Sequence, residues 1–128
     1  MTIALRAIVA LWGLGFGFMA LRGIINPAAW TEGFGVVAQE GAINNLRADY
    51  GAFFLVAALG ALWGAIQPRN AKALWVPAAL FGAALVIRLL GLAMGDPLTD
   101  AIKQAMAVEL ISVLLMMFAA RHFGKASL

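Results

Sequence analysis

Two charged residues, Arg88 and Glu109, stand inside long apolar stretches, where a lipid bilayer makes charge costly. An unpaired charge in the middle of a membrane helix costs roughly 3 kcal/mol or more. Every other charged residue lies at or near the end of such a stretch. The two residues therefore predict either a structural ion pair between two helices or a polar site for a ligand, proton or ion.

Arg88 and Glu109 are expected at matching depth on consecutive antiparallel helices. At 1.5 Å rise per residue, both lie roughly 12–14 Å below the outer boundary of the apolar stretches. A guanidinium can donate to both oxygens of a carboxylate, which would also fix the rotation of the two helices. Ser112 shares the face of Glu109, and Gly91, three residues after Arg88, is expected to leave room for the arginine side chain.

A second polar group opens the preceding apolar stretch. Arg47 and Tyr50 are three residues apart and share a helix face, which we expect to point from the outer end toward Arg88. The alternative is that both are interfacial anchors. The predicted cluster, for ligand binding or for structure, consists of Arg88, Glu109, Arg47, Tyr50, Ser112 and Asn45.

Other chemistry finds little support in the residue types. The chain has no cysteine and a single histidine, His122, which excludes disulfides, thiolate metal sites and a bis-histidine haem within the chain. No phosphate loop, nucleophile elbow or HExxH motif occurs. We therefore predict no catalytic residue, no metal site and no cofactor.

The composition predicts an integral membrane domain. Of 128 residues, 64% are hydrophobic and only 12% are charged, whereas soluble domains carry about 25% charged residues. The net charge of +3 does not indicate nucleic acid binding, because the basic residues lie at the ends of apolar stretches and form no patch. The expected partner is the lipid bilayer, with Trp12, Trp30, Trp63 and Trp75 as membrane anchors.

Four stretches are long enough to cross a bilayer as helices, at about 3–25, 46–66, 71–94 and 98–123. The first three end just before a proline, and none alternates as the strands of a barrel would. We predict an all-α fold: residues 1–128 form one four-transmembrane-helix bundle, with an interfacial loop or short helix between the first two helices, at Pro27–Asn45.

Glycines four residues apart occur in three of these stretches. Small residues at this spacing let two helix backbones approach closely, either within the chain or between subunits. They predict a tight bundle and leave open a homo-oligomer or a larger membrane complex. The pairs are Gly13 with Gly17, Gly60 with Gly64, and Gly91 with Gly95.

Basic residues also predict the orientation. Four spans place both termini and the 67–71 loop on one face, which carries five basic residues against three on the other. The positive-inside rule then places both termini in the cytoplasm. The five are Arg6, Arg69, Lys72, Arg121 and Lys125.

Short motifs resemble a family of small, uncharacterised four-helix bacterial membrane proteins, which look distantly like DoxX-type proteins. They are Leu46-Arg47-Ala48-Asp49-Tyr50-Gly51, Arg88-Leu89-Leu90-Gly91-Leu92 and the acid Glu109, whereas the turn Gly95-Asp96-Pro97 departs from the family pattern. The resemblance implies a bacterial inner membrane location and groups Arg47, Tyr50, Arg88 and Glu109. It implies no substrate.

Three functions remain open. The first is a non-catalytic membrane protein, either an accessory subunit of a larger complex or a binder of a small amphipathic ligand such as a quinone or lipid. The second is a minimal proton-linked transporter that uses Glu109. The third, a lipid-modifying membrane enzyme using Glu109 or Tyr50, is the least expected, because no spacing of residues requires it.

Overall fold

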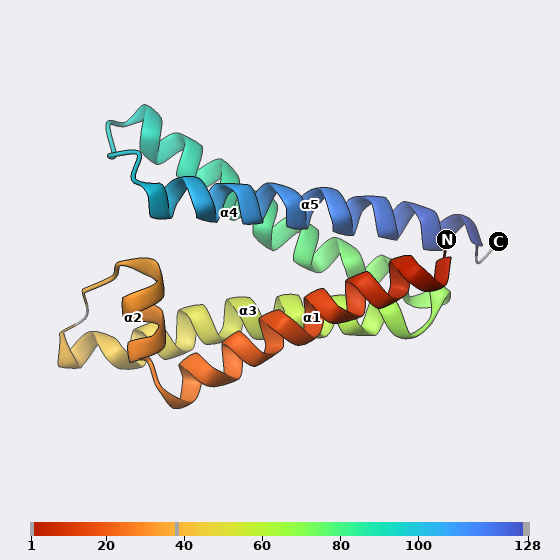
Figure 1. The fold of residues 1–128 in the computed structure, drawn as a ribbon, viewed down its shortest axis with the longest axis horizontal. Coiled ribbons are helices and arrows are strands. Elements are labelled where there is room, and N and C mark those ends of the chain that lie inside the picture. Colours follow the sequence, from red (N-terminus) through yellow and green to blue (C-terminus); the bar gives the residue numbers. More distant parts are fainter. Residues whose placement is uncertain (1, 38, 127–128) are drawn as a thin grey trace.

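The computed structural model describes residues 2–37 and 39–126. Four helices in it are long and apolar enough to cross a membrane, which confirms the predicted all-α class and makes the chain a multi-pass membrane protein. The α-helices are α1 (Thr2–Ile25), α2 (Ala28–Phe34), α3 (Ile43–Ile66), α4 (Trp75–Ala93) and α5 (Asp100–Ala126), and the 3₁₀ helices are η1 (Glu40–Ala42) and η2 (Pro68–Leu74) (Figure 1).

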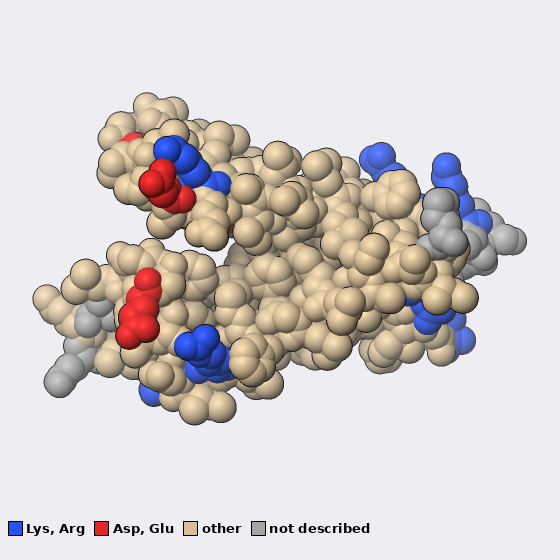
Figure 2. All heavy atoms as spheres, viewed as in Figure 1, with Lys and Arg blue, Asp and Glu red and all other residues tan. Residues whose placement is uncertain are grey.

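The long helices form two pairs. Helix α1 packs along α3, and α4 packs along α5, while η2 lies between α3 and α5 and joins the pairs. Both termini lie at the end where the pairs meet, and α2 lies at the opposite end, where the pairs diverge (Figure 1). We call the gap between the diverging pairs the outer cleft; it is visible between the two halves of the space-filling view (Figure 2).

Three helix boundaries differ from the expected ones. Helix α3 begins at Ile43 instead of Leu46, since polar residues are tolerated at a helix end outside hydrocarbon. The stretch before Trp75 is the tighter helix η2 and not part of α4. Helix α5 begins at Asp100, because the Thr99 hydroxyl accepts a hydrogen bond from the Ile102 amide at 3.3 Å and caps its first turn.

The glycine pairs of α1 and α3 pack inside the chain. A Cβ on Gly13 would lie 2.9 Å from Leu62 of α3, and a Cβ on Gly60 would lie 2.9 Å from Pro77 of α4. These faces therefore bring helices of one chain together.

At the third glycine pair, the atoms nearest to a Cβ on Gly91 belong to Asp96 of the following turn and not to another helix. The Asp96 side chain folds back over Gly91, and Gly95 adopts a φ of 103° in the turn after α4. The space beside Gly91 is thus taken by Asp96, and the expectation that it accommodates Arg88 is wrong. Asp96 reaches it because its amide donates to the Gly91 carbonyl at 3.0 Å.

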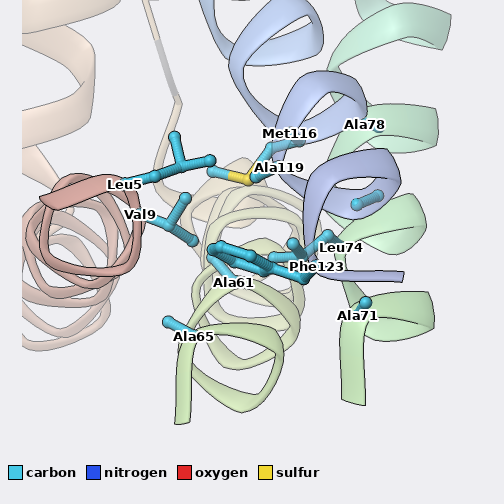
Figure 3. Close-up of a cluster of buried hydrophobic side chains, with 11 residues drawn as sticks. Leu5, Val9, Ala61, Ala65, Ala71, Leu74, Ala78, Met116, Ala119 and Phe123 are labelled. Carbon is cyan, nitrogen blue, oxygen red and sulfur yellow. The ribbon is translucent and has the colours of Figure 1, made fainter. Parts of the chain in front are cut away.

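Buried apolar side chains close the end of the bundle that holds the termini. All four membrane-length helical segments contribute to this inner cluster, which packs around the fully buried Phe123 (Figure 3). Its members are Leu5, Val9, Ala61, Ala65, Ala71, Leu74, Ala78, Met116, Ala119, Ala120 and Phe123.

Two arginines join α1 to α3 at opposite ends of the pair. Arg6, near the start of α1, donates through Nε to the Ala65 carbonyl at 2.7 Å and through Nη2 to Ile66, at the end of α3. Arg47, near the start of α3, donates through Nε to the Ile24 carbonyl at 2.9 Å, at the end of α1. Each cation therefore satisfies carbonyl groups that a helix C-terminus leaves free.

The ends of α1 and α5 also meet at the closed end of the bundle. The Thr2 hydroxyl lies 3.1 Å from Nε2 of His122, within hydrogen-bond distance. The outer surface between the two ends is apolar, with exposed side chains such as Leu11, Phe18 and Leu114. Figure 2 shows charge at both ends, an uncharged middle, and, on this face, acidic residues gathered at the end opposite the termini.

Candidate functional site

Arg88 and Glu109 meet across α4 and α5. Arg88 Nε donates to Glu109 Oε1 at 2.7 Å. The arginine side chain is 36% exposed, whereas that of Glu109 is 7% exposed. The structure thus contains the contact that the depth argument expected, with the carboxylate buried and the guanidinium partly exposed.

Helical spacing explains why the two side chains face inward. Leu74, Phe81 and Arg88 follow one another at seven-residue intervals, so they lie on one face along η2 and α4. Leu74 and Phe81 are buried. Arg88 is the next member of the same row, and its side chain is partly exposed.

The corresponding row on α5 begins with Glu109. Ser112 and Met116 follow it at three and seven residues, and both are buried. The Ser112 hydroxyl accepts a hydrogen bond from Trp12 Nε1 of α1 at 3.0 Å. The polar residues of α5 are therefore connected to both helix pairs, with Glu109 bound to α4 and Ser112 bound to α1.

The carboxylate is only half satisfied. Glu109 is 5% exposed, and its Oε2 atom has no hydrogen-bond partner among the described residues. Arg88 uses Nε for Glu109, and the described part of the chain offers no acceptor to its two terminal nitrogens. A buried carboxylate oxygen without a donor costs about 1–3 kcal/mol or more, so this arrangement has unused capacity to bind a polar group.

A shallow, open surface pocket of about 430 Å³ lies along α3 and is bounded on one side by Leu80 of α4. Asp49 is the one charged residue of its lining; the others are Ala48, Ala52, Phe53, Val56 and Leu80. Phe53 in turn contacts Phe81, one row position below Arg88, with ring centroids 5.2 Å apart. Neither Arg88 nor Glu109 is among the residues that line this pocket.

Three residues predicted for the cluster lie elsewhere. Arg47 turns toward α1 and donates to the Ile24 carbonyl, so its placement beside Arg88 is wrong. Tyr50 packs its ring against Trp30 at 5.8 Å and Phe34 at 5.5 Å, in an aromatic group under α2. Asn45 is exposed in the first turns of α3.

Two tryptophans that the sequence suggests as membrane anchors are structural. Trp12 lies in the middle of α1, contacts Phe16 and Phe81, and donates to Ser112. Trp30 is 1% exposed and occupies the space that Gly23 leaves on α1. The position of Trp12 at mid-span was the available signal, because anchors lie at span ends.

The four membrane-length helices, with a polar pair between two of them, define a small multi-pass membrane protein. The family model described as domain of unknown function DUF4345 matches residues 4–120, and the chain belongs to this family. No curated protein and no solved structure matches the chain.

Proposed function

We propose that this protein is a non-catalytic membrane protein that binds a small amphipathic, quinone- or lipid-like ligand at Arg88 and Glu109. The observation that carries the proposal is the half-satisfied pair: Glu109 is buried with Oε2 unpartnered among the described residues, beside a partly exposed guanidinium. A binding site needs few polar groups among apolar walls, and the outer cleft offers that combination.

The inner cluster favours a binder over a proton-linked transporter. Below Glu109, the next polar contact is the bond between Ser112 and Trp12, and beyond it lie the buried side chains of the inner cluster. A carrier must open its site alternately to both sides of the membrane, which would require this packed cluster to separate. A site open at one end needs no such change.

The setting of the site is part of the proposal. We propose a bacterial inner membrane with both termini in the cytoplasm, supported by the basic residues at the end that holds the termini (Figure 2). The outer cleft then opens to the opposite side. Association with a larger complex, a homo-oligomer and distant kinship to DoxX-type proteins remain hypotheses of the same kind.

Native mass spectrometry in mild detergent tests the binding function. Wild-type protein is expected to retain a small amphipathic molecule that is absent from the double variant Arg88→Ala/Glu109→Ala. The matched control is Asp100→Ala/Lys103→Ala, which removes an exposed ion pair on α5 and is expected to retain the molecule. Equal retention by all three proteins, or no retained molecule in any, would contradict the proposal.

A further inference from the structure

The unused hydrogen-bonding groups of the pair define what it can bind. Glu109 Oε2 accepts hydrogen bonds and is without a donor among the described residues. The terminal nitrogens of Arg88 donate and are without an acceptor there. A hydroxyl group both donates and accepts, so one hydroxyl oxygen can serve Glu109 and Arg88 together.

The charge of the pair selects against ions. Arg88 and Glu109 contribute opposite unit charges joined at 2.7 Å, so their sum is zero. An anionic head would gain from Arg88 but be repelled by Glu109, and it would also lose its hydration in a low-dielectric site. A neutral head avoids both costs.

The depth of the pair selects against ordinary phospholipid heads. Arg88 precedes the end of α4 at Ala93 by five residues and the turn at Asp96 by eight, which places it about 12 Å below that turn. Half-buried Leu92 on α4 and Ile102 and Met106 on α5 continue the same inner faces toward the opening. A large zwitterionic head would have to pass these apolar side chains, whereas a single hydroxyl crosses at lower cost.

Access comes from the arginine side. Oε2 is covered, whereas 36% of the Arg88 side chain is exposed. An approaching hydroxyl therefore meets the guanidinium first, and rotation of the Glu109 carboxylate about its side-chain torsions presents Oε2 to the same group.

We propose that the ligand class is a neutral, hydroxyl-bearing lipid (a phenol, a quinol or a long-chain alcohol) whose hydroxyl donates to Glu109 Oε2 and accepts from Arg88. This inference rests on the proposed binding function and deepens it. It distinguishes the reduced form of a quinone from the oxidised form, because the quinone has no donor for Oε2.

Paired probes test the inference in detergent solution. Binding of 4-nonylphenol and of its methyl ether, 4-nonylanisole, is measured by equilibrium dialysis, and the variant Arg88→Ala/Glu109→Ala corrects for partition into the micelle. We expect wild-type protein to bind the phenol about tenfold more tightly than the ether, the cost of one unmade hydrogen bond to a charged group. Nonanoate, an anion of similar tail length, is expected to bind no more tightly than the ether.

The variants Glu109→Gln and Asp49→Asn sharpen the test. In Glu109→Gln, the preference for the phenol is expected to fall close to equality, because an amide can turn its NH₂ toward an ether oxygen. Asp49→Asn, in the pocket wall, should keep the preference. If Glu109→Gln does not fold, the ratio of the affinities of wild-type protein for the phenol and for the ether decides alone.

The outcomes separate the two proposals. Equal, Arg88-dependent binding of phenol and ether, or tighter binding of nonanoate, would overturn the hydroxyl assignment and leave the binding function standing. If neither phenol nor ether binds wild-type protein more than the double variant, and native mass spectrometry finds no retained molecule, both proposals fail.

Discussion

Arg6 and Arg47 make the same kind of contact at opposite ends of one helix pair. Arg6 on α1 donates to the last carbonyls of α3, and Arg47 on α3 donates to the Ile24 carbonyl near the end of α1. A cation at a helix C-terminus is favoured both by these hydrogen bonds and by the helix dipole. The two arginines therefore fix how far α1 can slide along α3.

Removing either arginine is expected to destabilise the α1–α3 pair. Arg6→Ala loses two hydrogen bonds and is expected to lower the free energy of unfolding by about 1–2 kcal/mol, and Arg47→Ala by about 1 kcal/mol. Thermal unfolding in detergent measures the difference. Arg69→Ala, on the exposed side of η2, is the control and should change little; equal effects of all three would argue against the capping role.

Breaking the Arg88–Glu109 pair from one side is expected to be costly. Arg88→Ala leaves a buried carboxylate without a partner and is expected to lower the free energy of unfolding by about 3 kcal/mol. This value is toward the lower end for buried ion pairs, because the Arg88 side chain is 36% exposed. The additional change Glu109→Ala should restore at least half of the loss. The exposed pair Asp100–Lys103 should show coupling below about 1 kcal/mol in the same double-mutant cycle. An additive cycle at Arg88 and Glu109 would refute the energetic role of the pair.

The bond between Trp12 and Ser112 gives a third prediction. Trp12→Phe keeps an aromatic ring but leaves the Ser112 hydroxyl buried without its donor, which should cost about 1–3 kcal/mol. Ser112→Ala on the Trp12→Phe background should then be close to neutral, because neither partner is left unpaired. Unfolding in detergent checks this; a large further loss in the double variant would show that Ser112 acts through another contact.

Two glycines of α1 provide a matched packing test. Gly23→Ala places a methyl group where the buried Trp30 indole lies, so overpacking is expected to cost about 1–3 kcal/mol. Gly15→Ala meets no atom within 4 Å and should instead stabilise the helix by up to about 1 kcal/mol. If both variants changed the stability measured by thermal unfolding in the same direction, the position of Trp30 would be contradicted.

Depth along a helix could be read from the sequence, but rotation could not always be. Arg88 and Glu109 are level because each lies at a similar distance from the short turn between α4 and α5, and counting residues gives that distance. The all-α class followed from the lengths of four apolar stretches, and the structure confirms it. These properties depend on local spacing alone.

Arg47 and Trp30 show what spacing does not contain. The sequence places Arg47 near the outer end of α3, but its direction depends on the free carbonyl of Ile24, in a helix distant along the chain. Trp30 is of the residue type that is favoured at membrane interfaces, yet its side chain is buried in the space that Gly23 of α1 leaves. Both outcomes depend on how α1 and α3 are rotated against each other, which an apolar helix without a polar face leaves undetermined.

The contact of Thr2 with His122 has a mechanical consequence. It lies at the closed end of the bundle, where η2 also connects the two helix pairs. A small rotation of one pair about this end moves nearby atoms little, but the long helices act as lever arms and enlarge the displacement at the far end. Bending at the closed end therefore changes the width of the outer cleft more than it changes the helix spacing near the termini.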